Sequence, residues 1–140
     1  MDSNVKGKWR LGVRSTLSAA HALRHYEGKC ERLHGHNFEI NAEIEGERLQ
    51  DGAEIVLDFK ILKNLLAKVL EPFDHAVLNE IAPFDRINPS SENLARFIAD
   101  ELGTMLKNFA VDGSGPRVRG VTVSEKDGQY AVWIPSESPQ

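Results

Sequence analysis

The chain has 140 residues, a hydrophobic fraction of 41%, a charged fraction of 27% and a formal net charge of −4. These values are typical of one water-soluble domain, and the acidic balance argues against bulk electrostatic binding to nucleic acid or to an anionic membrane. No apolar run approaches the roughly 20 residues of a membrane-spanning helix, and the first residues, MDSNVKGKW, lack the apolar stretch of a secretory signal, so we expect none. The single cysteine excludes an internal disulfide, so we expect a cytoplasmic protein. We expect one domain over residues 1–140, with an ordered core over about 9–134.

The first regular pattern is a strict alternation of apolar and polar residues, which predicts a strand from Trp9 to His21. The positions on its core-facing side are, in order, Trp9, Leu11, Val13, Ser15, Leu17, Ala19 and His21. A histidine is therefore the last residue of this strand on the face that we expect to be buried.

A second alternating run begins at His34 and predicts a strand that extends to about Glu47. Its core-facing positions are His34, His36, Phe38, Ile40, Ala42 and Ile44. The opposite face, which we expect to meet water, carries Asn37, Glu39, Asn41, Glu43 and Glu45. The connection between the two strands is charged, with a turn expected at Gly28.

A hairpin from the first strand to the second would bring the end of one to the start of the other. His21, His34 and His36 are therefore predicted to converge. Three imidazole ligands that leave one coordination position open are typical of a catalytic Zn²⁺ site. His25 falls outside this set, and we expect it in an exposed loop.

The middle of the chain predicts two helices, each with apolar residues at helical spacing. The first is capped by Asp58 and ends at Pro72, and the second begins near Ser91, with Ser90 or Ser91 as its N-cap. Residues 73–90 are expected to form an irregular connection between them.

Two further strands are predicted over residues 118–125 and Tyr130–Ile134, with Asp127-Gly128 as their hairpin turn. The order β-β-α-α-β-β predicts an α+β fold in which a four-stranded antiparallel sheet carries both helices on one face. Both outer strands would expose unpaired backbone groups, so we predict a homo-oligomer that continues the sheet.

Cys30 has three interpretations from sequence. It could be a fourth zinc ligand that closes the site, a small buried hydrophobic residue, or a reactive thiol beside Lys29 and Arg32. The charged neighbourhood and the distance of four residues from His34 favour the reactive thiol.

Two acidic positions also carry a possible function. Glu125 shares its strand face with apolar residues, where a carboxylate is costly unless it has a partner. It could lie beyond the core, or it could accept two N–H bonds from the amidine-like edge of a pterin or guanine. Asp74-His75 could be an exposed loop pair or an acid–base pair, and adjacency alone does not establish a hydrogen bond between them.

Taken together, these motifs resemble the 6-pyruvoyltetrahydropterin synthase / 6-carboxytetrahydropterin synthase family over residues 11–134. The similar segments are Ala19-Ala20-His21, Cys30-x-x-x-His34-Gly35-His36, Asp58-Phe59, Asp74-His75-x-x-Leu78-Asn79, Pro89-Ser90-Ser91-Glu92-Asn93 and Glu125. Each is weak alone, but their order and spacing together are specific. The chain departs from the family at Leu17, Phe73 and Ser90, where phenylalanine, leucine and threonine are usual.

The resemblance implies the tunnelling fold (T-fold), with trimeric barrels that stack as a homohexamer and active sites between subunits. It implies zinc ligands at His21, His34 and His36. It further implies a proton-abstracting thiolate at Cys30, a catalytic pair at Asp74 and His75, and a pterin site formed by Glu125, Ser90 and Ser91.

The short spacing between Cys30 and His34 resembles the branch of the family that acts in queuosine biosynthesis. That branch converts 7,8-dihydroneopterin triphosphate to 6-carboxytetrahydropterin and releases triphosphate and acetaldehyde. The alternatives are the pyruvoyl-forming reaction of the same family and an oligomeric pterin-binding protein with a structural zinc. The triphosphate requires local cations, for which the candidates are Arg14, Arg24, Lys29 and Arg32.

Overall fold

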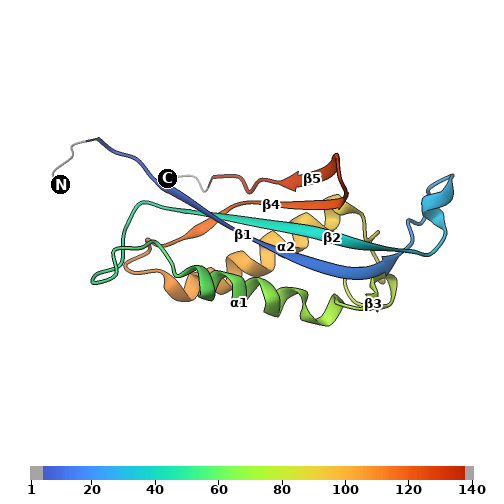
Figure 1. Ribbon diagram of the computed structural model, residues 1–140, viewed down its shortest axis with the longest axis horizontal. Coiled ribbons are helices and arrows are strands. Elements are labelled where there is room, and N and C mark those ends of the chain that lie inside the picture. Colours follow the sequence, from blue (N-terminus) through green and yellow to red (C-terminus); the bar gives the residue numbers. More distant parts are fainter. Residues whose placement is uncertain (1–4, 138–140) are drawn as a thin grey trace.

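The structure is a computed structural model that describes residues 5–137, and it contains one five-stranded sheet with two helices packed on one face (Figure 1). The sheet order is β3-β1-β2-β4-β5. The strands are β1 (Trp9–His21), β2 (His34–Gly46), β3 (Ala76–Val77), β4 (Arg117–Lys126) and β5 (Gln129–Trp133). The helices are α1 (Phe59–Leu70) and α2 (Ser91–Leu106). This arrangement confirms the α+β class and the T-fold predicted from the sequence.

Strands β1 and β2 form a long antiparallel hairpin that is paired along its whole length. Trp9 lies opposite Gly46 at one end, and His21 lies opposite His34 at the other. Leu17, Phe38 and Ile40 are completely buried, which confirms the face predicted from the alternation. The hairpin therefore carries its histidines on the side that is covered by the rest of the fold.

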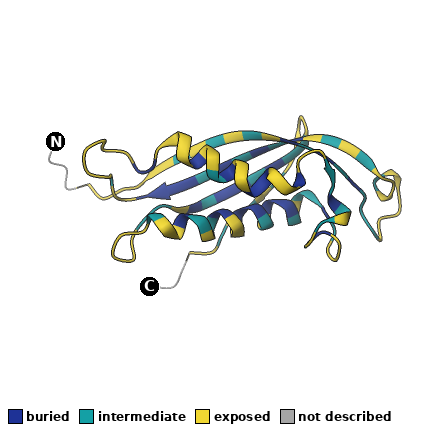
Figure 2. Cartoon of the chain, turned by 90° about the horizontal axis from the view of Figure 1, so that it is seen from below, coloured by how far each residue is buried: buried dark blue, intermediate teal, exposed yellow. Residues whose placement is uncertain are grey.

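Both helices begin at the predicted caps. The Asp58 side chain accepts a hydrogen bond from the amide of Lys60, and the Ser90 hydroxyl accepts one from the amide of Asn93. Figure 2 shows that the helices turn their buried residues toward the sheet and their exposed residues outward. This burial of one helical face against the sheet forms the hydrophobic core. No helix within residues 5–137 is long and apolar enough to cross a bilayer.

The prediction of a four-stranded, purely antiparallel sheet was wrong. The segment expected to be irregular contains β3, which runs parallel to β1 and pairs with Ala19 and Ala20. The amide of His75 donates to the carbonyl of Ser18 and leads the chain into this pairing. Two residues are too few to produce a periodic pattern, so the sequence could not indicate this strand.

Glu45 was expected to face water, yet only 5% of it is exposed. Its carboxylate contacts three basic side chains, those of Lys8, Arg117 and Arg119. Burial by itself would raise the pKa of Glu45, but the hydrogen bond from Lys8 and the charge of Arg117 bring that pKa below its usual value. The β2–β4 register shifts next to this cluster, where Glu43 opposes Gly120 and Ile44 opposes Val118. This shift leaves Arg119 opposite no residue, as in a β-bulge.

Candidate metal and pterin site

The three predicted histidines do converge. His21 ends β1, and its direct partner His34 begins β2, with His36 two residues further on the same face. One ligand nitrogen from each ring lies within 4.8 Å of the others. His21 is completely buried, whereas His34 and His36 are half-buried. The three rings therefore form a group that could hold a metal ion.

Backbone carbonyls fix the orientation of two of these rings. Nδ1 of His21 lies 2.6 Å from the carbonyl oxygen of Pro89, and Nδ1 of His34 lies 2.6 Å from that of Arg32. Because a carbonyl oxygen can only accept, each Nδ1 carries the proton and each Nε2 keeps a lone pair. This is the arrangement that metal-bound histidines usually show, since a second hydrogen bond holds the ring in place.

Two Nε2 atoms of the cluster have no hydrogen-bond partner among residues 5–137. Nε2 of His21 and Nε2 of His36 are buried, and neither makes a hydrogen bond to a described residue. Burial lowers the pKa of both side chains below the ordinary value of 6.5, so both imidazoles are neutral near pH 7. Buried lone pairs on neutral imidazoles suit a metal such as zinc.

Glu125 lies beside this cluster. One carboxylate oxygen is 3.8 Å from Nε2 of His21, and the other is 3.9 Å from Nε2 of His36. The Ser91 hydroxyl donates to the first of these oxygens at 3.2 Å. Carboxylate oxygens that face imidazole lone pairs repel them, and a bound cation would reverse that repulsion. The donor set therefore fits a metal ion.

Asp74 and His75 form a hydrogen-bonded pair at the edge of the sheet, which resolves the question that adjacency left open. Nδ1 of His75 lies 2.9 Å from one carboxylate oxygen of Asp74, and the amide of Ser18 donates to the other at 3.1 Å. The hydrogen bond from Ser18 lowers the pKa of Asp74 below its usual value, and His75 lowers it further. His75 has a φ of 58°, a conformation rare for a residue with a side chain. The backbone of Ser18 in β1 therefore holds both residues of the pair in place.

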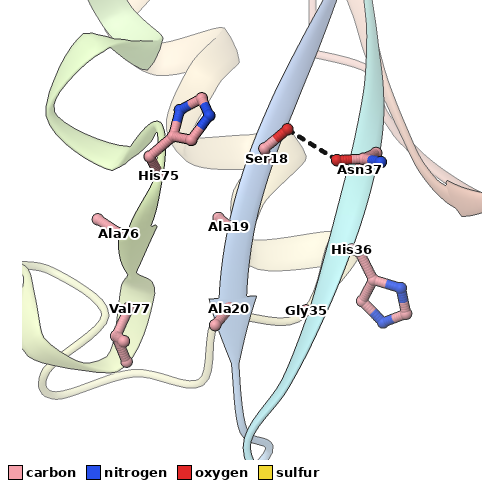
Figure 3. Close-up of a pocket in the computed structure, with 9 residues that line it drawn as sticks. All are labelled: Ser18, Ala19, Ala20, Gly35, His36, Asn37, His75, Ala76 and Val77. Carbon is pink, nitrogen blue, oxygen red and sulfur yellow. Dashed lines mark hydrogen bonds between the residues drawn. The ribbon is translucent and has the colours of Figure 1, made fainter.

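A shallow pocket of about 440 Å³ opens beside this pair, between β3 and the ends of β1 and β2 (Figure 3). Figure 3 shows His75 next to β3 and His36 on the far side of the β1–β2 pair, with its ring pointing away from His75. Ser18 donates to Asn37 across the two strands at 2.7 Å. His36 and His75 therefore line the same pocket, but their rings point away from each other.

Cys30 lies in a short 3₁₀ turn, Lys29–Glu31, in the loop that joins β1 to β2. It is a half-buried free thiol, and its carbonyl accepts a hydrogen bond from the amide of Leu23. No hydrogen bond or ion pair among residues 5–137 joins Cys30 or His75 to the three histidines. Within the described residues, a single chain therefore makes no polar link between the metal-binding and the acid–base groups.

The two predicted serines have different positions. Ser91 contacts Glu125, whereas the Ser90 hydroxyl is used to cap α2. Arg24, a predicted partner of the triphosphate, instead donates to the backbone carbonyls of Phe84, Ile87 and Asn79. Its guanidinium therefore holds the loop that contains residues 79–87.

Three residues hold the segments around the site through contacts that were not predicted: Pro89, Asn79 and Asn88. Pro89 and Asn79 lie in the segments that resemble the family, but no role was predicted for either side chain. Pro89 acts through its carbonyl oxygen, which every residue possesses. The side-chain amides of Asn79 and Asn88 bind the backbone of Ala22 and Arg24, just beyond His21. These contacts join segments more than 50 residues apart, so no local pattern reports them.

The fold and the cluster together define an α+β protein with a candidate metal centre at the loop end of its first hairpin, where β1 ends and β2 begins. The chain belongs to the 6-pyruvoyl tetrahydropterin synthase family, whose model matches residues 10–135.

Individual relatives differ in the reaction that their names describe. The chain is 32% identical to a 6-carboxy-5,6,7,8-tetrahydropterin synthase of Bacillus subtilis, over 86% of this chain and 82% of the relative. It is 37% identical to a dihydroneopterin monophosphate aldolase of Pyrococcus furiosus, over 68% and 75% of the two chains. The structure of Caenorhabditis elegans 6-pyruvoyl tetrahydropterin synthase superposes with a TM-score of 0.75 at 24% identity, covering 94% of this chain and 98% of that one.

Proposed function

We propose that this protein is a 6-carboxytetrahydropterin synthase of the queuosine (7-deazaguanine) pathway, in the cytoplasm. It would convert 7,8-dihydroneopterin triphosphate to 6-carboxy-5,6,7,8-tetrahydropterin and release triphosphate and acetaldehyde. The observation that carries the proposal is the cluster of His21, His34 and His36, with two buried nitrogens that make no hydrogen bond to any described residue. Membership of the family and the name of the Bacillus subtilis relative supply the chemistry.

His21, His34 and His36 would hold Zn²⁺, and the bound ion would supply Lewis acidity toward the side-chain hydroxyls of the substrate. Glu125 would accept the N–H groups along the amidine-like edge of the pterin, because a carboxylate can take two parallel hydrogen bonds. The Ser91 hydroxyl already donates to that carboxylate and would hold it in position. The ring would thereby be fixed relative to the histidine cluster, which aligns the reacting atoms.

Cys30, Asp74 and His75 would carry out the proton transfers. Cys30, as the thiolate, would remove a carbon-bound proton from the substrate side chain. His75 would transfer a proton on the opposite side of the substrate side chain, with Asp74 holding the imidazole ring through Nδ1.

Ser90 lies at the start of α2, in the segment that would help to hold the pterin ring. The basic residues that meet the triphosphate would include Lys29 and Arg32, which flank Cys30 in sequence.

A homohexamer, formed as a dimer of trimers, would complete the site. Among residues 5–137 no hydrogen bond or ion pair links Cys30 or His75 to the cluster, and Figure 3 shows the rings of His36 and His75, which line one pocket, pointing away from each other. Strands β3 and β5 are the sheet edges, and their free backbone groups suit continuation into neighbouring subunits. Neighbouring chains would then supply the catalytic pair to each other's metal centres.

Substitution of Cys30 tests whether the zinc site is catalytic. If Cys30 is the base, Cys30→Ala keeps its zinc and its stability but loses turnover by about a hundredfold or more. If Cys30 is instead a fourth ligand of a structural zinc, the same variant loses zinc and stability together. Metal analysis, thermal unfolding and turnover of wild type and variant distinguish the two. Retained turnover with retained zinc would contradict the assignment of Cys30 as the base.

A further inference from the structure

The chain beyond β1 is held by side chains in place of a neighbouring strand. The Asn79 amide accepts from the Ala22 N–H at 2.9 Å and donates to the Ala22 carbonyl at 2.8 Å. The Asn88 amide makes the same pair of bonds with the backbone of Arg24, both at 2.8 Å. Each asparagine therefore satisfies a backbone donor and acceptor as a paired strand would. The chain just beyond His21 is therefore held at two residues, Ala22 and Arg24.

The backbone of Asn88 and of the residues before it is also held by two other side chains, those of Asn93 and Arg24. Its carbonyl accepts a hydrogen bond from the Asn93 side chain at 2.8 Å. The Arg24 guanidinium donates to the carbonyls of Ile87 and Phe84, at 3.2 and 2.8 Å. Arg24 and Asn88 thus bind each other's segments reciprocally, since Asn88 binds the Arg24 backbone while the Arg24 side chain binds the residues before Asn88. Such closed networks leave little freedom to the peptide that they contain.

Pro89 follows Asn88 directly and is buried. Its carbonyl oxygen lies 2.6 Å from Nδ1 of His21 and is the contact that holds the proton on that nitrogen. Because peptide units are planar and the proline ring fixes φ, the position of Asn88 restricts where the Pro89 carbonyl can point.

We propose that Asn88 is a positioning residue for the histidine cluster. Its side-chain amide holds the Pro89 carbonyl against His21, keeps the ring proton on Nδ1 and leaves Nε2 free for the metal. This inference rests on the proposed metal centre, but its first consequence concerns the metal-free protein. Outer hydrogen bonds of this kind typically change metal affinity by about 10- to 100-fold.

The test compares wild type with Asn88→Ala in two measurements. Ring ¹⁵N chemical shifts of His21 in the metal-free protein report which nitrogen carries the proton. Zinc affinity is measured by competition with a chelator of known strength. We expect wild type to hold the proton on Nδ1 alone, and Asn88→Ala to show a mixture of both tautomers with zinc affinity lower by about tenfold or more.

Asn79→Ala is the matched control, because it removes the same two kinds of bond from Ala22 without touching the segment that holds Pro89. We expect it to retain the Nδ1 tautomer and most of the zinc affinity. An unchanged tautomer in Asn88→Ala, or equal losses in both variants, would overturn the proposal.

If Asn88→Ala folds poorly, Asn88→Asp keeps the bond from the Arg24 amide and takes its place with the same expectations. If wild type binds no zinc, the metal centre of the proposed function fails. The tautomer measurement then decides on Asn88 alone.

Discussion

His21 and His34 are direct partners in the β1–β2 ladder, and their ring centroids lie 4.6 Å apart. The last residue of one strand therefore meets the first residue of the next, and the hairpin register alone brings the two rings together. A slip of one residue would turn a histidine to the other face of the sheet. The candidate metal centre thus depends on the register of the longest strand pairing in the fold.

The histidine cluster should bind one zinc ion per chain, and His34→Ala should weaken that binding. Removing a ligand leaves only two protein nitrogens, so we expect zinc affinity to fall by at least about a hundredfold, more than the loss of an outer hydrogen bond causes. His25→Ala is the control, because His25 is exposed and lies outside the cluster. Equal zinc affinity in both variants, measured by chelator competition, would show that the metal binds elsewhere.

The stability of the zinc-free protein should fall on mild acidification. Burial lowers the pKa of His21 and His36 in the folded state, whereas in the unfolded chain both titrate near 6.5. The unfolded state therefore takes up more protons as the pH falls through 6.5, and the free energy of unfolding decreases.

Urea unfolding of the zinc-free protein at about pH 7.5 and about pH 5.5 measures this effect, and we expect the lower midpoint at the lower pH. His36→Gln removes one of the two groups and should show a smaller difference between the two midpoints. An unchanged or higher midpoint of wild type at the lower pH would contradict the burial of neutral histidines.

Glu125→Gln should separate pterin binding from metal binding. The amide keeps the shape of the side chain but loses the charge and one acceptor, so we expect kcat/KM to fall by about 10- to 100-fold, the size of one charged hydrogen bond. Zinc content should stay near that of wild type, because the three histidines remain. Unchanged binding of a non-reactive pterin analogue by this variant would count against Glu125 as the anchor.

Glu45, the buried carboxylate at the other end of the sheet, should contribute to the stability of the fold but not to metal binding or turnover. Glu45→Gln leaves Lys8, Arg117 and Arg119 around a neutral group, and because these cations are partly solvated we expect a loss of about 1–2 kcal/mol in the free energy of unfolding. Glu43→Gln, which breaks the exposed pair with Arg10, should cost less than about 0.5 kcal/mol. Similar losses in both variants, measured by urea unfolding, would refute this difference.

The parts of the fold that local periodicity describes were predicted correctly. The alternation that ends at His21 and restarts at His34 indicated both the hairpin and the meeting of the histidines, because side chains on a strand have a fixed period. Asp58 was predicted as the cap of α1, and Ser90 was one of two candidates for the cap of α2, since capping requires a particular side chain at a particular place.

The remaining features depend on contacts between distant segments. The strand β3 is set by its pairing with Ala19 and Ala20, and the burial of Glu45 is set by cations on other segments, including β4. Asn88 and Pro89 act on residues more than 60 positions away. The sequence next to each of these residues contains no information about its distant partner, so these features could not be predicted.

Product analysis tests the proposed reaction most directly. The zinc-loaded protein is incubated with 7,8-dihydroneopterin triphosphate, and the pterin product is identified by mass, with Cys30→Ala as the inactive control. We expect 6-carboxytetrahydropterin together with equal amounts of triphosphate and acetaldehyde. A 6-pyruvoyl product, cleavage of the monophosphate in preference to the triphosphate, or tight pterin binding without any product would contradict the account.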